Sequence, residues 1–175
     1  MLDSLRARES AILFAVQSRA SGQRIVVIAR IVSAFGEHAL GWAALAAAGV
    51  LFDSGRALQW ALAGGAVLGA HLLSIIVKRI VRRPRPNDPR VQVLASAPSA
   101  LSFPSSHATS AAASAVVFGF LLGPVALSVL CIALLATCLS RLVLGMHFTT
   151  DVLAGVFLGS CVGCVAQVIS EILVA

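Results

Sequence analysis

The chain has 175 residues, of which 59% are hydrophobic and only 11% are charged. A soluble domain carries about 25% charged residues, so this composition excludes an ordinary water-soluble protein and indicates one embedded in lipid. The 13 Lys and Arg residues outnumber the 7 Asp and Glu residues. Basic chains often bind nucleic acid, but these few charges lie between long apolar runs. We therefore expect a membrane setting with anionic lipid headgroups or a phosphorylated substrate as partners, and no nucleic acid. The length predicts a single domain over residues 1–175.

The N-terminal segment places Arg6, Arg8 and Glu9 ahead of a short apolar stretch, residues 11–16. This stretch is too short for the apolar core of a typical signal peptide, and no small-residue cleavage site follows it. The pattern predicts an amphipathic helix that lies on the membrane surface.

Five further segments are apolar enough to cross a bilayer, which takes about 20 residues per helix. They cover approximately residues 37–52, 58–80, 104–122, 125–142 and 149–174. Residues 22–35 form either a short half-buried helix or the first turns of a sixth span. The sequence thus predicts an all-α, polytopic membrane helix bundle of about five or six transmembrane helices, with one long polar loop over residues 81–103.

Four cysteines fall inside these apolar segments, and Cys161 and Cys164 have the spacing of a CxxC motif. That spacing can indicate a metal or redox site, but no His or acidic residue lies beside it. We interpret the cysteines as small packing residues.

The polar residues of the apolar segments gather at four helix ends. By the parity of successive spans, the end of the second helix, the start of the third, the end of the fourth and the start of the fifth share one membrane face. The polar residues at these ends are Lys78 with Arg85 in the following loop, Ser105, Ser106 and His107, Ser140 and Arg141, and His147 and Asp151. Span counting alone therefore predicts one polar cluster.

This cluster has the composition of a phosphate site. A phosphate group needs several cations and hydrogen-bond donors, and Lys78, Arg85 and Arg141 supply the cations. The Ser105 and Ser106 hydroxyls add donors at a predicted helix start, with Pro104 expected in the first turn. The free backbone N–H groups of that turn would form an anion site.

The two histidines of the cluster can divide the work of phosphate-ester hydrolysis. One attacks phosphorus, and the other protonates the leaving oxygen and then activates water. Asp151 follows His147 by four residues, so on a helix it lies one turn away on the same face. Its carboxylate can accept a hydrogen bond from one imidazole nitrogen and leave the other free to attack. This predicts His147 as nucleophile and His107 as acid/base.

Three motifs within this cluster resemble those of the type 2 phosphatidic acid phosphatase superfamily, which also includes vanadium haloperoxidases. Ten positions match in order. The K-x6-R-P motif is met by Lys78, Arg85 and Pro86, and the P-S-G-H motif by Pro104-Ser105-Ser106-His107. The S-R-x5-H-x3-D motif is met by Ser140, Arg141, His147 and Asp151. One position departs from the pattern, because Ser106 replaces the usual glycine.

The resemblance implies a helical, metal-independent phosphatase with no cofactor. It implies phosphate binding by Lys78, Arg85, Ser105 and Arg141, with His147, His107 and Asp151 as catalytic residues. Ser106 keeps the backbone N–H that the family uses at this position, and its hydroxyl adds a donor or narrows the pocket.

Several polar residues outside the motifs have simpler interpretations. We interpret Arg79, Arg82 and Arg83 as snorkelling anchors at a helix end. His38 and His71 are expected to pack or to lie at the interface, and Glu37 to cap a helix or to lie at the interface. Asp88 and Arg90 are expected in a solvated loop.

The membrane setting implies an amphiphilic substrate that diffuses laterally in a bacterial plasma membrane. Candidates are prenyl phosphates and diphosphates, phosphatidic acid and phosphatidylglycerol phosphate. The stretch from Phe103 to Ser110 most resembles actinobacterial enzymes that act on decaprenylphosphoryl-5-phosphoribose, and undecaprenyl diphosphate is the alternative. Two other classes stay open: a vanadium-dependent haloperoxidase, and a membrane protein that only binds phospholipid. The oligomeric state and the side of the membrane that holds the site are left open.

Overall fold

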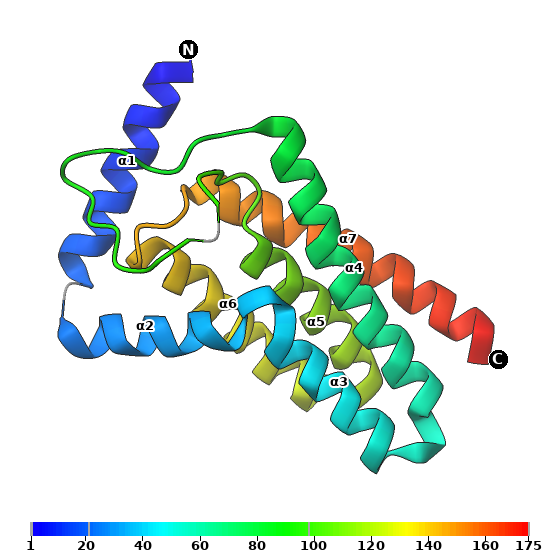
Figure 1. The fold of residues 1–175 in the computed structure, drawn as a ribbon. Coiled ribbons are helices and arrows are strands. Elements are labelled where there is room, and N and C mark those ends of the chain that lie inside the picture. The colour runs from blue at the N-terminus through cyan, green and yellow to red at the C-terminus, as the bar shows by residue number, and fades with distance from the viewer. Residues whose placement is uncertain (1, 21, 98, 175) are drawn as a thin grey trace.

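The structure is a computed structural model that describes residues 2–20, 22–97 and 99–174. Within these residues no β-strand forms, and Pro84 and Leu101 make one isolated bridge. The all-α prediction is confirmed. The elements in chain order (Figure 1) are α1 (Leu2–Arg19), α2 (Gln23–Phe35), the short 3-10 turn η1 (Glu37–Ala39), α3 (Leu40–Phe52), the 3-10 turn η2 (Ser54–Arg56), α4 (Ala57–Val81), α5 (Ser106–Leu122), α6 (Pro124–Val143) and α7 (Thr149–Val174).

Three of the described helical segments are long and apolar enough to cross a membrane by themselves, namely Ser54–Val81, α6 and α7. A fourth crossing is possible for the pair Gln23–Phe35 and Glu37–Phe52, which is bent by 43°. Helix α5 is apolar but has only 17 residues. The chain is thus a helical membrane protein with three or four candidate spans by length and composition, and the predicted five or six spans are not confirmed.

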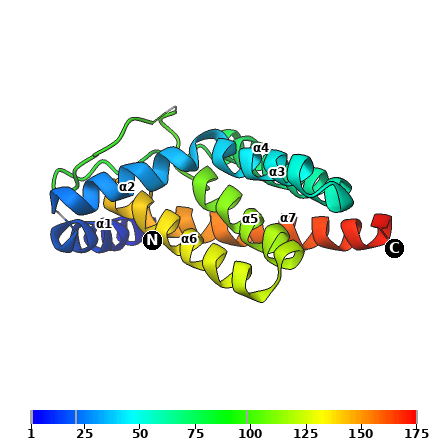
Figure 2. The ribbon, with the colours of Figure 1, turned by 90° about the horizontal axis from the view of Figure 1, so that it is seen from below.

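Helix α5 is the centre of the bundle and lies between the α3–α4 pair and helices α6 and α7 (Figure 2). Twelve of its 17 residues are buried, and most of these are Ala, Ser or Thr. Small residues allow close approach between membrane helices. Helix α7 adds the glycine face Gly155, Gly159 and Gly163, where a Cβ on Gly159 would lie 2.1 Å from the Thr109 carbonyl oxygen. The N-terminal ends of α5 and α7 are therefore held side by side.

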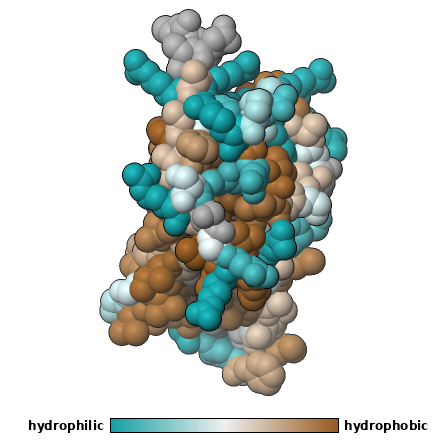
Figure 3. Space-filling view, turned by 90° about the vertical axis from the view of Figure 1, so that its left-hand side faces the viewer, coloured by the Kyte–Doolittle hydropathy of each residue, from teal (hydrophilic) through white to brown (hydrophobic). Residues whose placement is uncertain are grey.

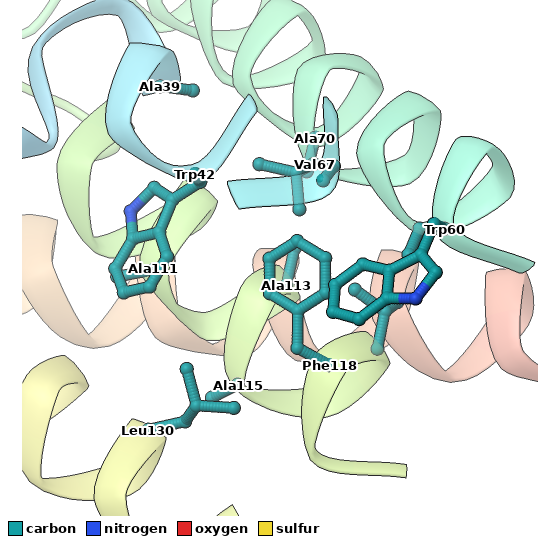
Figure 4. Close-up of a cluster of buried hydrophobic side chains, with 13 residues drawn as sticks. Ala39, Trp42, Trp60, Val67, Ala70, Ala111, Ala113, Ala115, Phe118 and Leu130 are labelled. Atoms are coloured by element: carbon teal, nitrogen blue, oxygen red, sulfur yellow. The ribbon is translucent and has the colours of Figure 1, made fainter. Parts of the chain in front are cut away.

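The apolar core lies along the middle of the bundle and joins α3, α4 and α5 (Figure 4). The Trp60 and Phe118 rings lie 5.6 Å apart between centroids, and Trp42 is also buried. Trp60 packs on Gly49, where a Cβ would lie 2.0 Å from the indole ring. Its Nε1 donates to Asp53 Oδ2 at 3.0 Å. Both tryptophans are thus packing residues of the core.

The chain between α2 and α3 bends at Gly36 and then makes the η1 turn. His38 and Ala39 have φ values of 50° and 60°, outside the right-handed helical region. The helix predicted to begin near residue 37 therefore begins at Leu40, and residues 22–35 form a separate helix. Because of this bend, the η1 turn packs on α5, and Ser33 near the C-terminal end of α2 lies next to His107 at the start of α5.

Helix α1 is docked on the long loop over residues 82–105 (Figure 1). The Gln17 side chain donates to the Gln92 and Val143 carbonyl oxygens at 2.7 and 3.0 Å and accepts from the Gln92 N–H at 2.9 Å. The predicted amphipathic pattern is not confirmed, because Glu9 and Gln17 are buried while Ile12 and Phe14 are exposed. Hydrophilic side chains gather over the upper part of this end of the molecule, and hydrophobic ones cover more of the lower part, with some hydrophilic ones among them (Figure 3).

Candidate active site

A cavity of about 260 Å³ lies between the η1 turn, the C-terminal half of α4, the long loop and the N-terminal end of α5. Six of the eight residues predicted for the site line this cavity: Lys78, Arg85, Ser106, His107, Arg141 and His147. The predicted grouping of these helix ends is therefore present in the structure. Ser105 and Asp151 lie behind the cavity wall, and both are fully buried. A second cavity, of about 440 Å³, contains Arg56 and Glu171 and none of the predicted site residues.

Three cations converge on this cavity without carboxylate partners. Lys78 and Arg141 are 8% and 4% exposed. Lys78 Nζ lies 3.4 Å from the Leu101 and Ser102 carbonyl oxygens, and Arg85 donates to the Ser99 and Met146 carbonyl oxygens at 2.9 and 2.7 Å. Among the described side chains, no carboxylate lies within ion-pair distance of any of the three. Because buried charges are costly unless they are paired, this arrangement calls for an anionic ligand.

His147 lies at the base of the cavity, in the turn just before α7, and is 2% exposed. Its Nε2 is 3.4 Å from Arg85 Nη1, on the side of the cations. Burial lowers the pKa of His147 well below its ordinary value, and the positive charges of Arg141, Arg85 and Lys78 lower it further. The imidazole is therefore neutral at neutral pH and has a lone pair available for attack.

Asp151 lies behind His147, but not in the predicted hydrogen bond. The distance from its Oδ2 to His147 Nδ1 is 3.6 Å, which is beyond hydrogen-bond range. The carboxylate is held by other donors instead: Oδ2 accepts from the Phe148 N–H and Oδ1 from Arg83 Nη1, both at 2.8 Å. Asp151 thus places a carboxylate next to Nδ1 of the His147 ring. The position of this carboxylate is determined by its hydrogen bonds to Phe148 and Arg83.

His107 is the second residue of α5 and is 7% exposed. Its Nε2 lies 3.1 Å from the Ser33 carbonyl oxygen and 3.5 Å from Glu37 Oε2. Ser33 also accepts a hydrogen bond from Arg141 through its hydroxyl. Because Gly36 has no side chain, the η1 turn can approach the His107 ring closely; a Cβ there would lie 3.0 Å from Cδ2.

The start of α5 differs in detail from the prediction. Ser105 is the N-cap residue, so Pro104 lies outside the first turn and not within it. The Ser105 hydroxyl accepts from the Ala108 N–H at 3.5 Å, and the Ser105 N–H donates to the Asp151 carbonyl oxygen at 2.9 Å. Ser105 therefore caps α5 and joins it to α7 while Ser106, one residue later, faces the cavity.

Arg83 is the clearest error of the sequence interpretation. It is not a snorkelling anchor, because its guanidinium binds the buried Glu9 and Asp151 carboxylates at 2.5 and 2.8 Å. The sequence around Arg83 does not indicate these ion pairs, because Glu9 and Asp151 are far from Arg83, and from each other, along the chain. Of the other two arginines, Arg79 lines the cavity, and Arg82 is exposed and donates to the Arg79 carbonyl oxygen.

Three further residues that the sequence placed outside the site line the cavity: Glu37, His38 and His71. The rings of His38 and His71 are 6.2 Å apart between centroids. Only the bend at Gly36 brings Glu37 and His38 against α4 and α5, so no spacing in the sequence could have indicated them. Asp88 and Arg90 pair with each other at 2.8 Å in the loop, and Arg90 holds the pKa of Asp88 at about 2.

Comparison with known proteins agrees with this arrangement. The PAP2 superfamily pattern matches residues 59–172. A decaprenylphosphoryl-5-phosphoribose phosphatase of Mycolicibacterium smegmatis is 45% identical over 148 residues, which cover 84% of this chain and 81% of that protein. A protein of the same name from Mycobacterium tuberculosis is 41% identical over 160 residues, covering 91% of this chain and 89% of its own length.

Two solved structures have the same fold. A transmembrane PAP2 type phosphatidylglycerolphosphate phosphatase from Bacillus subtilis superposes with a TM-score of 0.81 at 22% identity, covering 96% of this chain and 87% of its own. Aquifex aeolicus LpxE gives a TM-score of 0.73 at 19% identity, covering 89% of this chain and 92% of its own. The chain belongs to the PAP2 superfamily and has the fold of its membrane phosphatases.

Proposed function

We propose that this chain hydrolyses the phosphomonoester of decaprenylphosphoryl-5-phosphoribose through a phosphohistidine intermediate on His147. The observation that carries the proposal is the convergence of three unpaired cations on a cavity with a buried, neutral histidine at its base. The mycobacterial relatives, at 41–45% identity over most of the chain, support this substrate.

The geometry supports a two-step mechanism. The substrate phosphate binds between Lys78, Arg85 and Arg141, with the N–H groups at the start of α5 as further donors. His147 Nε2 attacks phosphorus, the bond from phosphorus to the ribose oxygen breaks, and His107 gives that oxygen a proton. Water then attacks the phosphohistidine, its proton passes to His107, and inorganic phosphate leaves. Asp151 stabilises the positive charge on the His147 ring during both steps.

The lining of the cavity beyond the cations supports a hydroxylated leaving group. Glu37, His38 and His71 also line the cavity and offer hydrogen-bond donors and acceptors. A pentose can use such groups, whereas the prenyl chain next to the phosphates of undecaprenyl diphosphate cannot. This favours a phosphorylated sugar lipid over undecaprenyl diphosphate and phosphatidic acid.

We also propose how the chain lies in a bacterial plasma membrane. Helices α3 to α7 cross the bilayer, with α5 enclosed by the others. At 1.5 Å per residue, α5 is about 26 Å long, which nearly matches the hydrocarbon core and leaves its polar start among the headgroups. Helices α1 and α2 lie at the interface, where the exposed Arg6, Arg8 and Arg24 reach headgroups.

A phosphate-release panel tests the proposal. Purified protein in mixed micelles is given decaprenylphosphoryl-5-phosphoribose, undecaprenyl diphosphate, phosphatidylglycerol phosphate and phosphatidic acid, and each is repeated with His147→Ala. We expect the fastest release from the phosphoribose lipid and none above background from the variant. Release at the wild-type rate by His147→Ala would refute the nucleophile. A clear preference for undecaprenyl diphosphate would refute the substrate.

A further inference from the structure

A buried ionic network joins the first helix of the chain to the site. Arg83 Nη2 donates to Glu9 Oε2 at 2.5 Å, and Arg83 Nη1 donates to Asp151 Oδ1 at 2.8 Å and to Thr150 Oγ1 at 2.6 Å. Glu9 Oε1 also accepts from the Thr150 hydroxyl and N–H, at 2.5 and 3.2 Å. One guanidinium thus connects α1, the loop after α4 and the first turn of α7.

The burial of this network shows that its members depend on each other. Glu9 is 3% exposed and Asp151 is fully buried, and a buried carboxylate is costly without a cation and hydrogen bonds. Arg83 is the only lysine or arginine within ion-pair distance of either carboxylate among the described side chains. The planar fork of an arginine can serve two carboxylates at once, which a lysine cannot.

The network acts on the carboxylate that faces the proposed nucleophile. Arg83 holds Oδ1 of Asp151, and the Phe148 N–H holds Oδ2. With both oxygens held, Oδ2 stays opposite His147 Nδ1 at 3.6 Å. The Arg83 guanidinium also lies 4.3 Å from the centroid of the Phe148 ring, next to His147 in the chain. A shift of Arg83 would therefore move both the carboxylate and the turn that bears the imidazole.

We propose that Arg83 and Glu9 are positioning residues that hold Asp151 against His147, so that helix α1 completes the active site. This rests on the proposed function, because it assigns Asp151 a role toward His147 in phosphoryl transfer. Neither residue lines the cavity. Their effect therefore falls on the chemical step, with substrate binding left unchanged.

The test measures kcat and KM for decaprenylphosphoryl-5-phosphoribose with Arg83→Lys and Glu9→Gln. Misplacement by about 1 Å can cost about 100-fold in rate, so we expect kcat to fall about 100-fold for Arg83→Lys and about tenfold for Glu9→Gln, with KM within about twofold. Arg82→Lys and Glu171→Gln are the matched controls, because both residues are exposed and their side chains bond to Arg79 and Gln167 and not to the network. They should keep the wild-type kcat.

Melting temperatures in detergent separate positioning from folding. Glu9→Gln is isosteric and keeps one acceptor oxygen, so it should melt within a few degrees of the wild type and still lose kcat. Unchanged kcat in both variants, a raised KM at constant kcat, or a kcat loss that appears only in unfolded protein would each overturn the proposal. If His147→Ala is inactive while Arg83→Lys is normal, this inference alone fails. If His147→Ala is active, the proposed function fails.

Discussion

Replacing Asp151 by asparagine tests the link between the carboxylate and the nucleophile. The change removes one negative charge 3.6 Å from His147 Nδ1 and leaves the shape of the side chain nearly intact. At an effective dielectric constant of about 20, two unit charges at this separation interact by about 4.6 kcal/mol. In the proposed mechanism, that energy stabilises the His147 ring as it becomes positive during attack on phosphorus. Its loss corresponds to a rate reduction of about 10³-fold.

The assay measures phosphate release at saturating substrate. In parallel, the phosphoenzyme is trapped by denaturing the protein without acid, because phosphohistidine is acid-labile. We expect kcat of Asp151→Asn to fall by about 10³-fold and the phosphoenzyme to form more slowly. Asp88→Asn is the control, because among the described residues the Asp88 carboxylate pairs only with Arg90 in the loop. A folded Asp151→Asn protein with less than a tenfold loss would show that the carboxylate does not stabilise the imidazole.

Three other predictions concern the charge of the site, its independence of metals and the packing behind it. Burial and nearby cations lower the pKa of His147 well below its ordinary value of 6.5. Because only the neutral ring attacks in the proposed mechanism, kcat/KM should stay constant as the pH falls to 6.5 and decrease only at lower pH. A decrease of kcat/KM with a midpoint above pH 6.5 would contradict this prediction. In the proposed mechanism Lys78, Arg85 and Arg141 bind the phosphate, so excess EDTA should leave activity unchanged. A loss of activity that one divalent metal restores would refute that assignment. Gly159→Ala puts a Cβ 2.1 Å from the Thr109 carbonyl oxygen, so it should lower stability in detergent by about 1–3 kcal/mol. At Gly65 an added Cβ meets nothing within 4 Å, so Gly65→Ala should be neutral or stabilising by up to about 1 kcal/mol.

Much of this fold could be predicted because the apolar segments are long and sharply bounded. The expected segments 58–80, 125–142 and 149–174 differ from α4, α6 and α7 by at most one residue at either end. Breaks such as Gly123-Pro124 act locally, so they can be recognised without tertiary contacts. The start of α3 was harder to predict, because the bend at Gly36 depends on the packing of η1 against α5.

The candidate site was also predictable in part from the sequence. Helix parity and motif spacing indicated that Lys78, Arg85, His107, Arg141 and His147 belong together, and the cavity contains all five. Parity could make this prediction because a helix that crosses a bilayer must return on the opposite face. Parity does not determine the rotation of a helix about its axis. It therefore could not show that Ser105 caps α5 while Ser106 faces the cavity.

The sequence by itself determined the membrane setting, the helical class and the set of residues suited to phosphate chemistry. These follow from composition and from spacing within single segments. Only the tertiary structure decided that Arg83 binds Glu9 and Asp151, and that Glu37 reaches His107. The partner of a buried charge depends on which helices are neighbours and which faces they present. That choice is made by packing between residues as far apart as Glu9 and Thr150, 141 positions along the chain.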